Sequence, residues 1–261
     1  MSKTFFPFII PDNCQRVAYR PTNRNFMGQH IIATRKDMEV YHILKYRFEK
    51  ISSRQFRIID NHFRNMDGGV TSFYVVDWSD PRVIKAISGD KVTLNNVHGF
   101  SSNTGDGGNR VILWSNDGDY GNDSTISSNV LTDLSKSWTV NEWADFKLMD
   151  SIGTERTASQ NTGNTIMVMS GSLINPGAYD IYQYYNRYVS SLDVSGRNIH
   201  LNASPELTFS EYKQFALPVY ECFYMEDTLS LEPEEFNLES NDNYGPLYAG
   251  EINFMQKGTG T

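Results

Sequence analysis

The sequence predicts a mainly β fold with one short helix, and three observations carry that prediction. Apolar and polar residues alternate over residues 38–49, which is the period of a half-buried strand. Elsewhere, short apolar runs are separated by turns rich in Gly, Asn, Asp and Ser. Aromatic residues make up 13% of the 261 residues, and aromatic side chains favour strands. The chain is long enough for one large β domain or for two smaller ones.

The first third of the chain is expected to form a strand, a helix and a second strand. The alternating segment is the first strand. At Ser52 or Ser53 a helix can be capped, and apolar residues then recur at helical spacing until the Gly68-Gly69 pair. A second strand is expected over 72–76. The side chains expected to pack together as the core of this unit are Tyr46, Phe48, Phe56, Ile59, Phe63, Phe73 and Val75.

The rest of the chain is expected to be β structure interrupted by polar loops. Long loops are predicted at 103–109 and 116–128, where Asn, Gly, Asp and Ser dominate. A hairpin-like pair is expected around the Ser195-Gly196-Arg197 turn. The predicted strands span 91–95, 110–115, 147–151, 165–169, 179–184, 191–194, 198–201, 214–225 and 250–255.

The two ends of the chain have one character and the middle has another. Residues 1–91 and 191–261 carry the helix and the aromatic strands, whereas residues 92–190 are rich in Asn, Gly, Ser and Thr. We expect the ends to fold together as one discontinuous core domain and the middle to form an inserted β-module. Trp138 and Trp143 are expected to anchor the small core of that module.

Charge and hydropathy limit the classes of partner. A net charge of −8 argues against nucleic-acid recognition, because neutralising phosphates requires clustered Lys and Arg. The charge is uneven, since residues 1–64 are basic and residues 221–251 are acidic. Head-to-tail packing of identical subunits and two solvated faces both account for this asymmetry. No segment approaches the roughly 18 apolar residues of a membrane-spanning helix. Cys14 and Cys222 are expected to be buried thiols in a reducing compartment.

No residue pattern predicts an enzyme, a cofactor or a metal site. Histidine pairs at zinc spacing, a phosphate-binding loop and a nucleophile elbow are absent from the sequence. Asp117, Asp119 and Asp123 alternate as calcium ligands do, but the glycine that an EF-hand loop needs at its sixth position is missing. We therefore expect a solvated turn there. The acidic cluster at 232–235 is expected to be an exposed loop rather than a catalytic carboxylate pair.

The middle of the chain resembles a module that is common in bacteriophage virion proteins. In that module a Trp-x-x-Asn-x-Trp segment precedes a Ser-x-Asn-Thr-x-x-Thr turn. The matching residues are Trp138, Asn141, Trp143, Ser159, Asn161, Thr162 and Thr165. The resemblance implies a role in assembly rather than in chemistry.

The two ends resemble distal tail proteins of long-tailed phages and of phage-like gene transfer agents. In that family a strand leads into one helix, then a glycine and an aromatic-Asp strand, and a late Pro-Val-x-x-x-Phe strand is followed by an acidic residue and Leu. The matching residues are 41–48, 53–66, Gly68-Gly69, 73–77, Asp80, 218–223, Asp227 and Leu229. The large middle insertion and the longer C-terminus depart from the family pattern.

This resemblance implies a tail-tube-like β-sandwich or split barrel with one flanking helix, and an inserted small β-domain. Copies would form a ring, typically a hexamer, that joins the tail tube protein to the hub or baseplate proteins. The expected function is therefore that of a structural virion protein of the tail tip, assembled in the host cytoplasm.

Two other functions stay open. The first is a receptor- or carbohydrate-binding minor tail protein, with Trp114, Tyr182 and Tyr185 as glycan contacts, because aromatic faces stack on sugars. The second is a tail-associated hydrolase, which would turn over cell-wall or capsule material and lose activity when one carboxylate is replaced.

Overall fold

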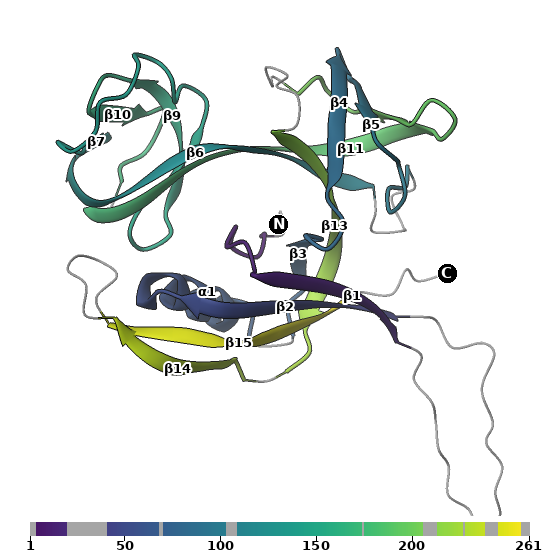
Figure 1. Cartoon of the computed structure of the whole chain (residues 1–261), viewed down its shortest axis with the longest axis horizontal. Coiled ribbons are helices and arrows are strands. Elements are labelled where there is room, and N and C mark those ends of the chain that lie inside the picture. The colour runs from purple at the N-terminus through teal and green to yellow at the C-terminus, as the bar shows by residue number, and fades with distance from the viewer. Residues whose placement is uncertain are drawn as a thin grey trace, which may run out of the picture.

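Fifteen strands and one helix make up the described part of the chain, so the predicted mainly β fold is confirmed (Figure 1). The computed structural model describes residues 4–19, 41–67, 70–102, 109–173, 175–205, 213–226, 228–237 and 245–256. All pairings between the strands are antiparallel. The buried side chains gather in three hydrophobic clusters, and the strands group around them as a terminal lobe and two small barrels.

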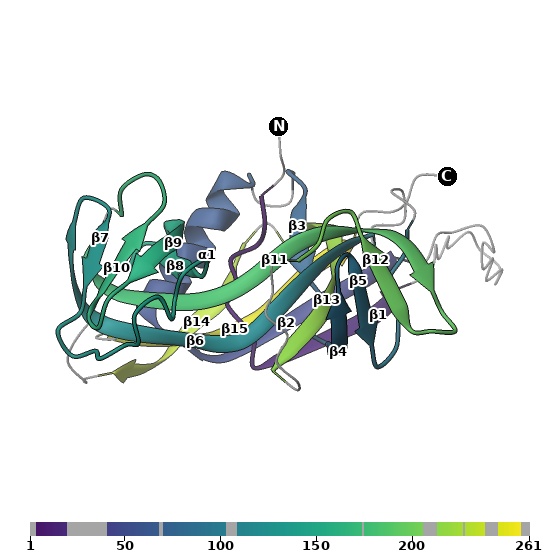
Figure 2. The same cartoon turned by 90° about the horizontal axis from the view of Figure 1, so that it is seen from above.

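The terminal lobe combines the first and last elements of the chain. It consists of β1 (Asn13–Tyr19), β2 (Tyr41–Ile51), α1 (Ser53–Asn65), β3 (Phe73–Val76), β14 (Ser230–Asn237), β15 (Gly245–Gln256) and the end of β13 (Gln214–Tyr224). β2 lies between β1 and β15, and β15 also pairs with β13 and β14. Helix α1 packs on the face of this sheet (Figures 1 and 2).

Local sequence signals account for the start and the packing of α1. Ser52 is the N-cap, since its hydroxyl accepts from the backbone N–H of Gln55 while the Gln55 side chain accepts from the Ser52 N–H at 2.9 Å. Ile59 is fully buried against the sheet. The ring of Phe56 stacks on Tyr248 with ring centroids 4.0 Å apart. The apolar stripe of the helix therefore faces the sheet.

Six strands close into a first barrel. They are, in order of pairing, β4 (Arg82–Ser88), β5 (Lys91–Leu94), β12 (Asn198–Leu201), β11 (Gly177–Asp193), β6 (Arg110–Ser127) and the beginning of β13, which pairs with β4 again. The side chains of Ile84, Val92, Leu113 and Ile199 fill its interior and are fully buried. Closure lets these strands pair on both sides around one hydrophobic cluster.

A second barrel closes on the other ends of the two longest strands. Its strands, in order of pairing, are β6, β7 (Val130–Thr132), β10 (Thr165–Val168), β9 (Glu155–Asn161), β8 (Lys147–Met149) and β11. Its interior holds Leu131, Leu148 and Ile166, each fully buried, together with Trp138 and Trp143. The two barrels therefore share β6 and β11, which we call the ribbon (Figures 1 and 2).

The prediction of a polar loop at 116–128 is wrong, because residues 116–127 belong to β6. Asn, Asp, Gly and Ser residues give no local signal for a strand. The backbone of residues 118–124 nevertheless pairs with β11, beyond the end of the first barrel. The register jumps between the Tyr182–Gly118 and Gln183–Ser115 pairs, which places a bulge in β6 where the ribbon leaves the first barrel. A Cβ atom at Gly118 would overlap the carbonyl oxygen of Ile181, so glycine is required there.

Other local expectations also change in the structure. The predicted strands 179–184 and 191–194 are parts of the single strand β11, and the acidic segment 232–235, expected as a loop, lies in β14. Strands β1, β4, β7 and β9 were not expected from the sequence. Gly68, Gly69 and residues 103–108 of the predicted loop 103–109 lie outside the described residues.

The predicted boundaries of the insert fall inside strands, since residue 92 lies in β5 and residue 190 lies in β11. The first barrel takes β4, β12 and β13 from the predicted core and β5, β6 and β11 from the predicted insert. The division into a core of residues 1–91 and 191–261 and an insert of residues 92–190 thus stays a prediction. The described residues form three hydrophobic clusters rather than one for each predicted unit.

Candidate functional site

The segment 4–12 lies between the terminal lobe and the ribbon. Its backbone exchanges hydrogen bonds with β3, and the buried ring of Phe6 packs on Phe254 of the lobe, with centroids 4.9 Å apart. The ring of Phe8 stacks on Tyr184 of β11 at 4.2 Å. Aromatic side chains of this segment therefore fill the seam, by which we mean the contact region between the terminal lobe and the ribbon. This use of aromatic residues agrees with their high content in the chain.

A carboxylate joins β9 to β11 within the second barrel, next to Phe8. Glu155 at the start of β9 accepts hydrogen bonds from the hydroxyls of Tyr182, at 2.6 Å, and Tyr184, at 2.9 Å. Burial, together with this carboxylate, raises the pKa of both tyrosines well above the ordinary value. Both hydroxyls therefore stay protonated and act as donors to Glu155.

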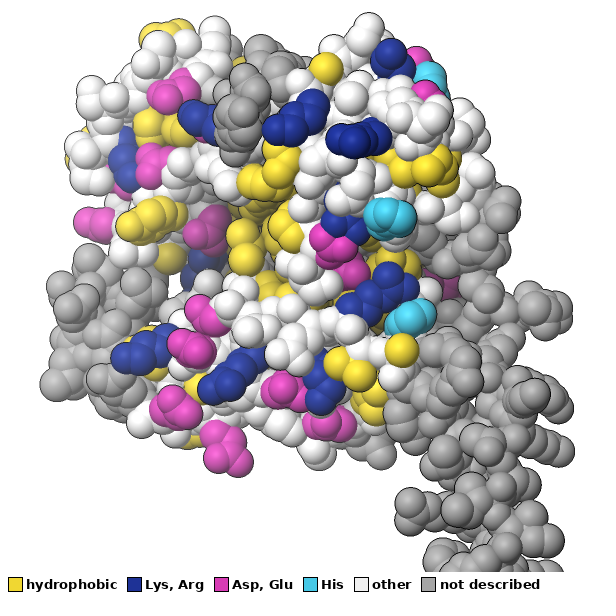
Figure 3. Space-filling view, turned by 45° about the vertical axis from the view of Figure 1, so that its right-hand side comes forward, with side chains coloured by type: hydrophobic (Ala, Val, Ile, Leu, Met, Phe, Trp, Pro, Cys, Tyr) yellow, Lys and Arg dark blue, Asp and Glu magenta, His cyan; other side chains and the backbone are white. Residues whose placement is uncertain are grey.

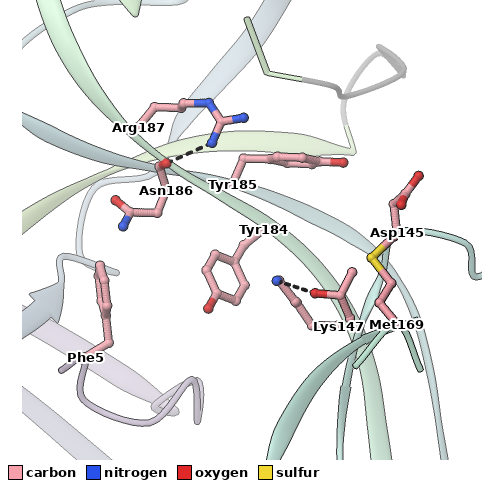
Figure 4. A pocket seen from close by; sticks show the side chains of 9 residues that line it. Phe5, Asp145, Lys147, Met169, Tyr184, Tyr185, Asn186 and Arg187 are labelled. Carbon is pink, nitrogen blue, oxygen red and sulfur yellow. Dashed lines mark hydrogen bonds between the residues drawn. The ribbon is translucent and has the colours of Figure 1, made fainter. Parts of the chain in front are cut away.

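A half-open hollow of about 430 Å³ lies beside this seam (Figure 4). One wall is residues 184–187 of β11, the opposite wall is Lys147 and Thr157 of the second barrel, and Phe5 closes one end. The space-filling view shows hydrophobic side chains in a depression between the barrels and the terminal lobe, with Lys, Arg, Asp and Glu side chains on the surface around it (Figure 3). Three separate parts of the fold thus meet at one concave surface.

Two cations flank the hollow, each next to a tyrosine ring. The ammonium of Lys147 lies 5.7 Å from the ring centroid of Tyr184 and donates to Thr157 Oγ1 at 2.8 Å. The guanidinium of Arg187 lies 5.5 Å from the ring centroid of Tyr185. A neighbouring hollow of about 400 Å³ shares Lys147 and adds Arg156. The two hollows are also lined by one carboxylate each, Asp145 and Glu155, so that three cations face two carboxylates on a chain whose net charge is −8.

The residues predicted to pack as core lie inside the hydrophobic clusters. Tyr46, Phe48, Ile59, Phe73 and Val75 are buried in the terminal lobe, with Phe56 and Phe63 partly buried against them. Trp138 and Trp143 are buried in the second barrel. Their contribution to a subunit interface stays a prediction, and within one chain they stabilise the fold.

The three predicted glycan contacts lie in different surroundings. Trp114 and Tyr182 are only 6% and 7% exposed, and their rings stack on each other with centroids 5.6 Å apart. Tyr185 is partly buried and lines the hollow. The sequence offers the run Tyr179, Tyr182, Tyr184, Tyr185 and Tyr188 as a possible sugar-stacking platform, and the site keeps Tyr184 and Tyr185 from it. It gains Lys147 and Arg187, which sequence reasoning missed. The available signal was the Tyr184-Tyr185 pair two residues before an arginine.

Two of the three aspartates considered as calcium ligands are held by separate partners, and Asp123 is exposed. Asp117 pairs with Lys213 at 2.9 Å, and Asp119 accepts from Lys136 at 2.9 Å and from the indole N–H of Trp138 at 2.7 Å. Among the residues that the structure describes, no three His, Cys, Asp or Glu side chains gather closely enough to hold a metal ion.

In comparisons with known proteins, no family model and no curated protein matches this chain. Within the described ranges, no helix is long and apolar enough to cross a membrane. The functional proposals therefore rest on the residues and the fold of this chain.

Proposed function

We propose that this protein is a structural component of a phage tail tip, which self-assembles into a ring and joins the tail tube to the hub or baseplate. The observation that supports the proposal most is which segments of the chain come together in the terminal lobe. The segments that resemble distal tail proteins, β2, α1, β3 and β13, lie far apart in sequence and pack around one hydrophobic cluster. β3 pairs directly with β13, with Phe73 opposite Cys222 and Val76 opposite Val219.

The lobe also has the two unlike edges that head-to-tail assembly needs. Among the described residues, β1 pairs with β2 alone and β14 pairs with β15 alone, so each presents one edge without a strand partner. Joining unlike surfaces of identical copies gives a ring when the rotation between copies closes. Two different strand edges are a suitable pair of such surfaces.

Charge supports different roles for the two edges. Some charges of the basic and acidic segments pair with each other inside the lobe, where Lys45 of β2 lies 3.4 Å from Glu251 of β15. Glu232 and Glu234 on β14 are exposed. An acidic edge of this kind disfavours pairing with its own copy and favours a basic neighbouring surface.

Native mass spectrometry of the full chain, with negative-stain images of the same sample, tests the proposal. We expect closed rings of about six copies, as cyclic closure of one repeated contact requires. Glu234→Lys should reduce the ring population, because it reverses the charge of the β14 edge. Asp123→Lys makes the same change at an exposed position on β6 and should leave the rings intact. A trimer, or a chain that stays monomeric even with tail tube and hub proteins present, would contradict the proposal.

A further inference from the structure

We infer that the hollow beside β11 binds an extended acidic peptide, which adds a strand to β11 between the two barrels. This inference concerns a ligand site in the ribbon and does not depend on ring assembly by the terminal lobe.

The edge of β11 is the first observation. On one side, residues 179–188 pair with β6 across the register shift. On the other side, β8 pairs with residues 180–182 and β12 pairs from Val189 onward. Within the described part of the chain, no strand pairs with that second side over residues 183–187. Five residues of a strand extend about 16 Å, which is the length of a short peptide.

Hydrogen bonds at the end of this gap show which backbone groups face it. The N–H of Tyr188 donates to Asn202 Oδ1, and the carbonyl of Tyr188 accepts from the Asn202 N–H, both at 2.9 Å on the β12 side. Alternate residues of a strand direct their N–H and C=O groups to the same edge. Tyr184 and Asn186 therefore present theirs to the gap. The guanidinium of Arg187 donates to the carbonyl of Asn186 at 3.0 Å, as the N–H of a paired strand would.

The shape of the hollow agrees with this assignment. Four consecutive residues, 184–187, line it, although neighbouring side chains of a strand point to opposite faces. Both faces of β11 border the same space only if the space lies along the edge of the strand. Figure 4 shows Tyr184 and Asn186 on one side of the β11 backbone and Tyr185 with Arg187 on the other. An extended chain placed there could pair with the backbone and direct its side chains to both faces.

The charged side chains that line the hollow, Lys147 and Arg187 against Asp145, favour an acidic peptide, because the two cations lie on opposite faces of the strand (Figure 4). Lys147 lies on the Tyr184 side of the strand and Arg187 on the Tyr185 side. An ammonium has three donors, and Thr157 uses one of those of Lys147. The Nε of Arg187 is buried and, among the described residues, has no hydrogen-bond partner. Carboxylate side chains on successive residues of a strand would reach one cation on each face. Strand addition supplies affinity through the backbone, and the charges supply selectivity.

The test uses acetylated and amidated pentaglutamate as the probe, with calorimetry on the full chain. We expect saturable binding. Pentaglutamine should bind at least about fivefold more weakly, since it lacks the charges. Pentaglutamate with an N-methyl group at every peptide bond should also bind at least about fivefold more weakly, because neither of its edges can donate to the strand. On pentaglutamate binding, the amide protons of Tyr184 and Asn186 should exchange more slowly.

Matched variants locate the site. Lys147→Gln and Arg187→Gln should each weaken pentaglutamate binding about fivefold. Lys91→Gln removes the same charge from an exposed position on β5 and should leave binding unchanged. Thermal unfolding of each variant shows that the fold is kept. The inference is overturned if pentaglutamate does not saturate, if Lys91→Gln weakens binding equally, or if N-methylation has no effect. It is also overturned if tetragalacturonate competes as well as pentaglutamate, because that marks an anion or saccharide site without strand pairing.

Discussion

Arg54 on α1 and Asp180 on β11 form an ion pair with an N–O distance of 2.6 Å, which joins the terminal lobe to the second barrel. The same guanidinium donates to the backbone carbonyl of Asp150 at 2.6 Å. One turn further along α1, Ile58 packs on Gly153, whose φ of 89° lies in the left-handed region. The helix therefore docks the second barrel on the sheet of the lobe.

Replacing Arg54 with alanine should destabilise the protein by about 3 kcal/mol, because Arg54 is 5% exposed and its loss removes the cation paired with Asp180 and one of the donors to the Asp150 carbonyl. Arg57→Ala is the matched control, since Arg57 lies on the exposed side of the same helix and should cost about 0.5 kcal/mol or less. Urea denaturation measures both. Equal losses for the two variants would show that the ion pair does not hold the parts together.

Gly118→Ala should destabilise the protein by about 2 kcal/mol or more, because the added methyl group overlaps the Ile181 carbonyl at the bulge of the ribbon. Gly163→Ala is the comparison. Its nearest neighbour would be the Trp138 carbonyl oxygen at 3.8 Å, so the change should be close to neutral. Thermal unfolding followed by circular dichroism reports both. A neutral Gly118→Ala variant would contradict the close approach of β6 and β11.

The stability of the protein should fall as the pH is lowered from about 6.5 to about 4. Burial lowers the pKa of His62 from 6.5 to about 4 in the folded chain. The unfolded chain therefore binds the proton first, and stability is lost across this window as the pH falls. A shift of this size corresponds to roughly 3 kcal/mol at 1.4 kcal/mol per pH unit.

His62→Phe should remove this loss, although it also removes the 2.8 Å hydrogen bond to Tyr224 and so lowers stability at neutral pH. His98→Gln, at an exposed position, should keep the wild-type slope. Urea midpoints measured between pH 4 and pH 7 test the prediction. The same slope in wild type and His62→Phe would rule out His62 as its cause.

Trp138→Phe should cost more than Trp143→Phe in the second barrel. The indole N–H of Trp138 donates to Asp119 at 2.7 Å, whereas that of Trp143 is buried and, in the described part of the chain, has no hydrogen-bond partner. Both variants lose similar size, so the difference of about 1 kcal/mol reports the hydrogen bond. Urea denaturation gives the two values, and equal costs would contradict this role of Trp138.

The hydrogen bond between Trp138 and Asp119 also predicts how the stability of the protein changes at acidic pH. Burial opposes ionisation of Asp119, but hydrogen bonds from Lys136 and Trp138 outweigh it and hold its pKa below the ordinary 3.8. A carboxyl group whose pKa is lowered by folding stabilises the folded protein at pH values above its ordinary pKa. This stabilisation is lost as the pH falls through the pKa that the group has in the folded protein. Carbonyl NMR titration should show the Asp119 pKa rising toward its ordinary value in Trp138→Phe. An unchanged titration would assign the shift to Lys136 and the backbone N–H of Tyr120.

Local sequence patterns were sufficient for the first strand and the helix. Alternation predicts the face of β2 that carries Leu44, Tyr46 and Phe48, and these side chains are buried in the lobe. The capping of α1 uses Ser52 and Gln55, three residues apart, and its buried stripe follows helical spacing. Both signals lie within a dozen residues, where backbone geometry and side-chain periodicity are directly linked.

The ribbon and the candidate site could not be predicted in this way. Residues 116–127 are mostly polar and contain two glycines, and they form a strand because β11, far along the chain, pairs with them. Along residues 179–188, where five tyrosines occur, spacing cannot show that Tyr182 is covered while Tyr185 lines a hollow. That difference arises from the packing of Phe8, Trp114 and Glu155, which belong to three other elements.

By itself, the sequence determined the mainly β class, the capped helix and the buried face of β2, because each depends on neighbouring residues. The tertiary structure decided that two barrels close on a shared ribbon, and that none of the described strands covers one edge of β11 between them. Backbone N–H and C=O groups are the same in every residue except proline. The partner of a strand is therefore decided by the distant segment that packs beside it, and local side-chain patterns do not show which segment that is.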